Sequence, residues 1–113
     1  MSSSSARRRE ASIAGLDKLL GHRSRLAVLV LLADGTRLTF KRLAELLDET
    51  DGNMGAHLRK LVAAEYISVA SDRPGGRQPR WYSITGEGRA ALRSHLDALQ
   101  SFVDQLDGVT GDE

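Results

Sequence analysis

The chain has 113 residues, of which 41% are hydrophobic and 27% are charged, and its formal net charge is +1. This length is typical of one domain, and the composition allows a real hydrophobic core. The absence of cysteine excludes disulfides, thiolate metal sites and thiol redox sensing. No apolar run approaches the roughly 20 residues that cross a membrane, and the N-terminus lacks the apolar core of a signal peptide. A cytoplasmic location is therefore expected.

The charges are distributed unevenly along the chain. Residues 94–113 contain five acidic and no basic side chains, which leaves sixteen basic and ten acidic side chains in the first ninety-three residues. The larger part of the chain therefore carries a basic surplus that the total conceals. Such a distribution suits a basic binding face beside an acidic flank.

The N-terminal residues 1–11 are expected to form a disordered basic arm, because they are polar and show no apolar periodicity. Arg7, Arg8 and Arg9 could follow a phosphate backbone or enter a minor groove, and a solvated tail is the alternative interpretation. A single domain is expected over residues 12–107. Residues 108–113 are expected to form a frayed acidic tail.

Two helices are predicted in the first third of this domain. The first is short and amphipathic, because Ile13, Leu16 and Leu20 lie three and four residues apart and Gly21 is placed to end it. The second spans Arg23 to Ala33 and is apolar on nearly every side. It is therefore either central to the core or covered by a second subunit.

The stretch from Thr39 to Glu65 predicts a helix-turn-helix. Thr39 is the expected cap of the first helix, Glu49 to Gly52 should form the turn, and Thr50 or Asp51 should cap the second helix. The second helix carries an apolar stripe that is expected to face the core, formed by Met54, Leu58, Leu61 and Val62. Its opposite side mixes small residues with polar ones that can reach bases or phosphates in a major groove, namely Asn53, Ala56, His57, Arg59, Lys60 and Ala63.

After residue 65 the apolar period changes to two, which predicts two antiparallel strands at 66–71 and 80–84. The side chains expected on the core side are Ile67, Val69, Tyr82 and Ile84. The loop at 72–79 contains two prolines and two glycines, and its charged side chains include Arg73 and Arg77, with Arg80 directly after it. A hairpin with an arginine-bearing tip is a wing, and Trp81 is expected to cover its root.

A long helix is predicted from Thr85, its cap, to about Leu106. Its apolar residues at spacings of four and three form a heptad seam of about two repeats. A seam at the end of a small chain has little left to pack against, so a homodimer is expected. The residues assigned to dimerisation are Ile13, Leu16, Leu20, Leu92, Leu96, Leu99, Phe102, Val103 and Leu106.

Three passages of the chain resemble the winged helix-turn-helix transcriptional regulators of the MarR and ArsR type. They are LDKLLGHRSR at 16–25, DGNMGAHLRKLVAAEYI at 51–67 and YSITGEGRAAL at 82–92. The resemblance covers about residues 13–105. It implies a mainly α fold with a small β-hairpin (α+β), in which N- and C-terminal helices dimerise. It also implies a sequence-specific, homodimeric DNA-binding regulator, with repression as the expected activity and a possible unidentified small-molecule effector.

The chain departs from this family's pattern at Gly55 and Ala56, where relatives frequently have Ser, Thr, Arg or Gln. Base reading is then expected to rest on Asn53, His57 and Lys60, or to be shared with DNA shape read by the wing. The metal-sensing branch of the family uses cysteine and histidine ligands. Because this chain has no cysteine, no metal and no other cofactor is expected.

Double-stranded DNA is therefore the predicted partner, bound at a pseudo-palindromic operator. The predicted DNA-binding residues are Asn53, Ala56, His57, Arg59, Lys60, Lys41, Arg42, Arg73, Arg77 and Arg80. For each of them a local structural role, as a cap, a packed side chain or a solvated charge, remains the alternative. An enzyme is not expected, since no nucleophile with a nearby base and no glycine-rich phosphate loop can be named. A winged-helix module that binds a protein instead of DNA is the rival interpretation.

Overall fold

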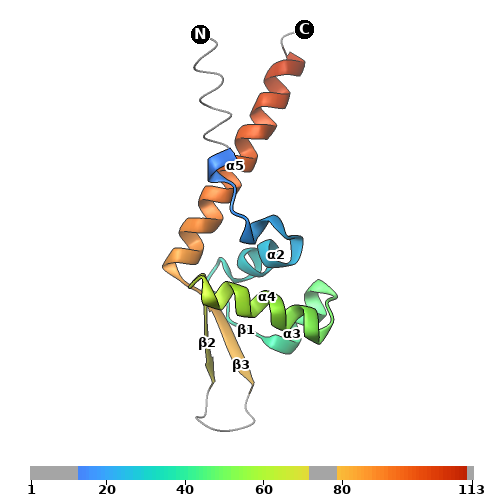
Figure 1. Ribbon diagram of the computed structural model, residues 1–113, viewed down its shortest axis with the longest axis vertical. Coiled ribbons are helices and arrows are strands. Elements are labelled where there is room, and N and C mark those ends of the chain that lie inside the picture. The colour runs from blue at the N-terminus through green and yellow to red at the C-terminus, as the bar shows by residue number, and fades with distance from the viewer. Residues whose placement is uncertain (1–12, 72–78, 112–113) are drawn as a thin grey trace.

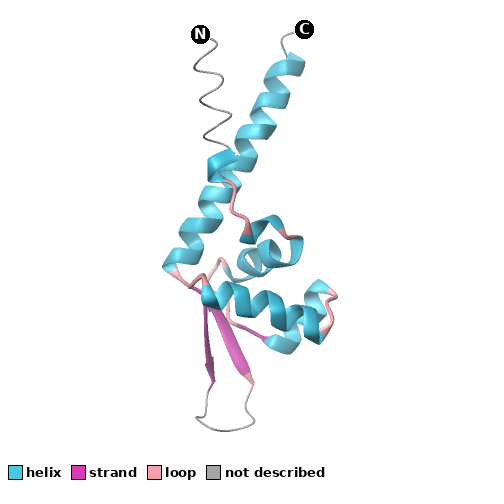
Figure 2. Ribbon diagram, viewed as in Figure 1, coloured by secondary structure: helices cyan, strands magenta, loops and turns pink. Residues whose placement is uncertain are grey.

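The computed structural model describes residues 13–71 and 79–111. A helical lobe and a small sheet lie at the lower end of Figure 1, and one long helix runs up and away from them. Figure 2 shows that more of the chain is in helices than in strands, in agreement with the predicted mainly α class. The elements in chain order are η1 (Leu19–Gly21), α2 (Arg23–Leu32), β1 (Leu38–Thr39), α3 (Phe40–Leu47), α4 (Asp51–Ala63), β2 (Ile67–Ser71), β3 (Arg80–Ile84) and α5 (Gly86–Gly111).

Helix α2 lies at the centre of the core. Its Val28, Leu29 and Leu32 side chains are fully buried, and α2 contacts α3, α4, β3 and α5. This resolves the two alternatives left by its nearly all-apolar surface in favour of the core. The other fully buried large side chains come from η1, α3, α4 and β2, and they are Leu20, Leu43, Met54, Leu58, Leu61 and Ile67.

The sheet has three antiparallel strands in the order β1-β3-β2. The predicted hairpin is present, with Ile67 opposite Ile84 and Ser71 opposite Arg80. Strand β1 was not predicted from the sequence. Two residues are too few to show a period of two, and β1 becomes a strand only by pairing with β3.

The predicted burial of the strands is partly wrong. Ile67 and Tyr82 are buried as expected, and Ile84 is half-buried. Val69, however, is exposed. It lies on an edge strand of the sheet, opposite Tyr82, where the alternation of side chains continues but the helical lobe no longer covers the strand.

The first predicted helix is also wrong as a continuous element. Residues 13–15 are helical, the chain then breaks, and η1 follows as a single 3-10 turn. Asp17 accounts for the break: its backbone N–H donates to His95 Nδ1 of α5 at 2.9 Å, and its Oδ1 accepts from the Leu19 N–H at 2.9 Å. Its Oδ2 accepts from the Tyr66 hydroxyl, and this bond raises the pKa of Tyr66 to about 12.

Helix α5 begins where the sequence predicted. Thr85 Oγ1 accepts from the Gly88 N–H at 2.9 Å and donates to the carbonyl oxygen of Glu65 at 2.6 Å, so the cap also fastens the helix to the end of the helix-turn-helix. The helix continues to Gly111, beyond the predicted end near Leu106. Its length gives the molecule a longest dimension of 61 Å (Figure 1).

Candidate nucleic-acid interface

Two threonine caps define the helix-turn-helix. Thr39 Oγ1 accepts from the Arg42 N–H at 3.1 Å and starts α3, as predicted. Thr50 Oγ1 accepts from the Asn53 N–H at 3.2 Å, so Thr50 is the cap of α4 and Asp51 is its first residue. The turn therefore lies earlier than predicted, at residues 48–50, and it begins at Asp48, which takes a left-handed conformation with φ 51°.

Helix α4 has one buried and one exposed side. Met54, Leu58 and Leu61 are buried and Val62 is half-buried, so the predicted core stripe is confirmed. On the other side Asn53, Arg59, Lys60 and Ala63 are exposed and Ala56 is half-buried. The core does not use these side chains, and they remain accessible to a partner.

His57 does not fit its predicted role as a direct DNA contact. The side chain is buried, with Nε2 2.9 Å from Glu49 Oε2 and Nδ1 3.2 Å from Arg25 Nη1. Because a guanidinium can only donate, Nδ1 must accept, and the proton of the neutral ring is then on Nε2 and is donated to Glu49. Both ring nitrogens are thus occupied within the protein, and His57 positions α4 instead of reading a base.

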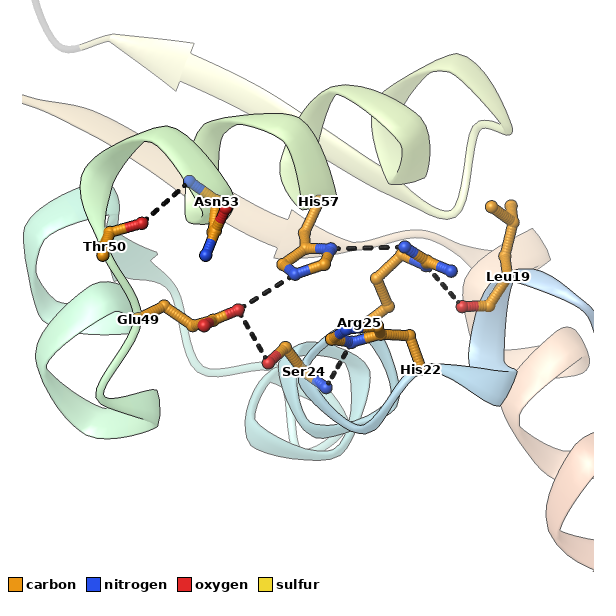
Figure 3. A network of polar contacts seen from close by, with 8 residues as sticks. All are labelled: Leu19, His22, Ser24, Arg25, Glu49, Thr50, Asn53 and His57. Atoms are coloured by element: carbon orange, nitrogen blue, oxygen red, sulfur yellow. Dashed lines mark hydrogen bonds and ion pairs between the residues drawn. The ribbon is translucent and has the colours of Figure 1, made fainter.

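His57 belongs to a polar network that joins α4 to the start of α2 (Figure 3). Ser24 Oγ donates to Glu49 Oε2 at 2.9 Å, and Arg25 Nε donates to the Leu19 carbonyl at 2.6 Å. His22 Nδ1 accepts from the Ser24 N–H at 3.1 Å, which caps α2, and the His22 ring centroid lies 4.3 Å from that of His57. The network fixes the orientation of α4 relative to η1 and α2.

The prediction placed Glu49 in the turn but assigned no role to the side chains of Ser24, Arg25 or Glu49. The sequence signal lay in the "H-x-x-R" passage from His22 to Arg25, which was treated as a family motif only, and in the His57-Leu58 pair, whose histidine was assigned to DNA reading. In the structure they form a polar cluster in which Ser24 and His57 are buried, Arg25 and Glu49 are half-buried and His22 is exposed. This cluster depends on contacts across 32 residues and has no local periodicity.

The network should make folding stability depend on pH. Desolvation, with the nearby His57 and Arg25 as lesser causes, lowers the pKa of His22 below its usual 6.5. The Ser24 hydroxyl bond, aided by the contact with His57, lowers the pKa of Glu49 below its usual 4.5. In both cases the unfolded chain binds more protons than the folded one, so the stabilisation is present above the usual pKa and is lost as pH falls through the lowered one.

We therefore expect the free energy of unfolding to decrease as pH falls below about 7.5, through the usual histidine pKa of 6.5 and on through the lowered pKa of His22. His22→Asn should show a smaller decrease, because asparagine can still accept the Ser24 N–H at the helix cap but does not titrate. Urea unfolding of both proteins at several pH values measures this. An identical pH dependence in the two proteins would contradict the role of His22.

Three of the remaining predicted DNA-binding residues lie in the described part of the chain and two lie outside it. Lys41, Arg42 and Arg80 are exposed, and the Arg42 guanidinium forms an exposed ion pair with Glu45 at 3.5 Å. Arg73 and Arg77 lie outside the described residues. Trp81 is half-buried beneath the Arg37 guanidinium, which lies 5.2 Å from the ring centroid.

The predicted dimerisation residues divide into two groups. Leu20 and Leu92 are only 1% and 7% exposed, so they belong to the core of the single chain and their assignment to a dimer surface is corrected. They sit where η1 and the start of α5 pack on the helical lobe. The others remain accessible: Phe102 is half-buried, and the exposed ones are Ile13, Leu16, Leu96, Leu99, Val103 and Leu106.

A hollow of about 630 Å³ lies at the base of this apolar surface, between the N-terminal segment, α2 and α5. Its lining is mainly apolar and includes Ile13, Leu16, Leu26 and Leu99, with His95 beside them. The hollow and the exposed side chains of α5 share Leu99, so they form one continuous surface.

The order of elements, the capped helix pair and the three-stranded sheet define a winged helix protein. The model of the family described as winged helix DNA-binding domain matches residues 24–103, and the chain belongs to this family. Over 72 residues the chain is 32% identical to the uncharacterized protein MJ0432 of Methanocaldococcus jannaschii, a match that covers 64% of this chain and 78% of that protein.

Solved structures agree with this assignment. A transcriptional regulator homologue from Pyrococcus horikoshii OT3 is similar with a TM-score of 0.71 and 26% identity, covering 79% of this chain and 88% of that one. The YusO protein of Bacillus subtilis has a TM-score of 0.70 at 15% identity, covering 93% and 74%, and supports the fold alone. The resemblance to winged helix-turn-helix regulators predicted from the sequence is therefore confirmed.

Among residues 13–71 and 79–111, no helix is both long and apolar enough to cross a membrane. In the same ranges no group of three or more histidine and acidic side chains is arranged to hold a metal ion.

Proposed function

We propose that the protein is a homodimeric regulator of transcription that binds a pseudo-palindromic operator in double-stranded DNA. The observation that carries this proposal is the exposed side of α4, where Asn53, Arg59 and Lys60 are not used by the core. Helix α4 would enter the major groove, and Lys41, Arg42 and Arg80 would contact the backbone beside it. Repression by occupying the operator needs no surface beyond these.

The dimer part of the proposal is supported by the apolar surface of α5. Leu96, Leu99, Val103 and Leu106 are exposed, and Leu106 is 69% exposed. A contiguous apolar face of this kind is typical of an interaction site, and the twofold packing of two α5 helices would cover it. The partner would also close the hollow beside Leu99.

Twofold symmetry has a consequence for the operator. Two α4 helices related by a dimer axis read two half-sites about 10 bp apart, or a small multiple of this distance. Selection from a random duplex pool at two salt concentrations tests the whole proposal. Enrichment of an inverted repeat supports it. Salt-sensitive binding without enrichment contradicts the sequence-specific operator, and an absence of binding at low salt favours the protein-interaction module.

Lys60→Ala should weaken binding to all duplexes by a similar factor and reduce the slope of log K against log salt concentration by about one unit, because one fewer counterion is released. Arg93→Ala is a suitable control, since Arg93 is an exposed basic residue on α5, away from the α4 surface. Fluorescence anisotropy over a salt series measures both. A slope for Lys60→Ala equal to that of the wild type would remove Lys60 from the interface.

A further inference from the structure

Two sets of polar contacts attach α5 to the rest of the chain, one at its start and one further along. At the start, Thr85 Oγ1 donates to the Glu65 carbonyl oxygen, and the Thr85 N–H donates to the Tyr66 carbonyl oxygen at 3.0 Å. Further along, His95 is 4% exposed and its Nδ1 accepts from the Asp17 N–H. His95 lies ten residues after Thr85, which is about 15 Å along a helix. One attachment would leave α5 free to pivot, whereas two attachments that far apart fix its direction.

Asp17 connects the second attachment to the helical lobe that carries α4. Its Oδ2 accepts from the Tyr66 hydroxyl, and its Oδ1 accepts from the Leu19 N–H at 2.9 Å. Leu19 is itself held to α2, because its carbonyl oxygen accepts from Arg25 Nε at 2.6 Å. The pKa of Tyr66, raised to about 12 by the bond to Asp17, keeps the hydroxyl protonated and therefore a donor at neutral pH. Asp17 thus joins η1, α5 and the end of the helix-turn-helix.

Tyr66 takes part in both attachments, so the contacts form a closed ring. Its carbonyl oxygen binds Thr85 and its hydroxyl binds Asp17, and the Asp17 N–H returns to α5 at His95. Helix α5 also packs on the lobe through apolar side chains such as Leu92. Apolar contacts have little directional preference, whereas hydrogen bonds hold only within a narrow range of distances and angles. The ring therefore selects one direction of α5 among those that apolar packing alone would allow.

We propose that Asp17 and Tyr66 are positioning residues that set the angle between α5 and the helical lobe, and with it the distance between the two α4 helices of the dimer. Leu99 and Val103 of the apolar seam lie beyond His95 on α5, so each lobe of a dimer joined there is carried by its own α5 (Figure 1). A shift of α4 by about 3.4 Å corresponds to one base-pair step. The ring thereby selects operators by the spacing of their half-sites. This consequence rests on the proposed function, whereas the fixed angle does not.

The angle is measured within one full chain and without DNA. Because the chain has no cysteine, Ala63→Cys on α4 and Asp104→Cys on α5 provide two defined sites for spin labels, and both positions are exposed. Labelled protein is diluted with an excess of unlabelled protein, so that distances within one chain dominate even in a dimer. Double electron–electron resonance should give a narrow distance distribution. In Tyr66→Phe the distribution should broaden and its maximum should shift, because α5 is then attached firmly only at Thr85.

Tyr82→Phe is the matched control, since it also removes one tyrosine hydroxyl but lies on β3, beside α4. It should keep the wild-type distribution. Asp17→Ala removes the other end of the bond and should broaden the distribution as Tyr66→Phe does. The double variant should add little to Asp17→Ala alone, as expected for two partners in one interaction. Wild-type distributions in both Tyr66→Phe and Asp17→Ala would overturn the proposal.

The consequence for the operator is measured with three duplexes: the selected inverted repeat, the same repeat with one base pair inserted between its half-sites, and a single half-site. Tyr66→Phe should reduce the wild-type preference for the selected spacing by about tenfold, the factor that one hydrogen bond to a charged group supplies. Its affinity for the single half-site should remain that of the wild type, whereas a loss of folded protein would weaken all three complexes equally.

An unchanged spacing preference beside a broadened distance distribution would refute the selection of operators and leave the fixed angle. If the wild type binds none of the duplexes, the proposed function fails, and the distance measurement still decides whether Tyr66 and Asp17 set the angle of α5.

Discussion

Replacing both Leu99 and Val103 with glutamate should convert the proposed dimer to a monomer. Binding to an inverted repeat should weaken by about 100-fold or more, because one protomer's binding no longer holds the second α4 near the other half-site. Both side chains are exposed on the single chain, so the substitutions leave the core intact. Sedimentation equilibrium measures the mass, and anisotropy with a labelled duplex measures the affinity. Circular dichroism should be unchanged.

A control for this experiment lies on the same helix. Gln100→Glu adds one negative charge at an exposed position outside the apolar seam, where Gln100 donates to Asp104. It should remain dimeric, whereas the single substitution Val103→Glu should already weaken the dimer. If the double variant sediments with the wild-type mass, α5 does not form the interface through these residues.

Gly88→Ala should destabilise the fold by about 3 kcal/mol or more, as expected when an atom is forced into fully packed space. The new Cβ would lie 2.1 Å from the Tyr66 carbonyl oxygen and 2.9 Å from its carbon, so the backbone itself would have to move. Urea unfolding gives the loss directly. The substitution would disrupt the contact between the N-terminal cap of α5 and the end of the helix-turn-helix.

Gly86→Ala is the matched comparison for this prediction. Gly86 lies two residues earlier in the same first turn of α5, and no atom lies within 4 Å of a Cβ built there. Alanine should therefore leave stability unchanged or raise it by about 0.4–1 kcal/mol, since it restricts the unfolded chain. Similar stability of Gly86→Ala and Gly88→Ala would show that the close approach to Tyr66 is relieved without cost.

Local sequence patterns were sufficient to predict the features of the fold that depend on contacts within one helix. Thr39 and Thr85 could be recognised as caps because a cap acts within three residues of itself. The buried side of α4 followed from helical spacing alone. The predictions failed where distant contacts intervene: Asp17 breaks the N-terminal helix by bonding to His95 and Tyr66, and Leu20 is buried by packing that its own helix period does not reveal.

In the candidate site, too, local spacing predicted some residues correctly and distant contacts determined others. Arg59 and Lys60 are exposed as the helical period predicted. His57 shares that polar side in the sequence, yet it is buried, because Glu49 and Arg25 offer it two partners from other elements. A polar residue near the edge of a helix face is exposed or buried according to such partners, and a single sequence does not show them.

The sheet order described above constrains when the domain can be completed as the chain is synthesised. Strand β3 is the middle strand, yet it is the last of the three to leave the ribosome. Neither β1 nor β2 has a neighbour to pair with until residues 80–84 have emerged, although α2, α3 and α4 are already available and can begin to pack through helical contacts. Until then the sheet edges of the nascent chain remain unpaired, and a stall shortly before Arg80 would leave a helical intermediate prone to aggregation.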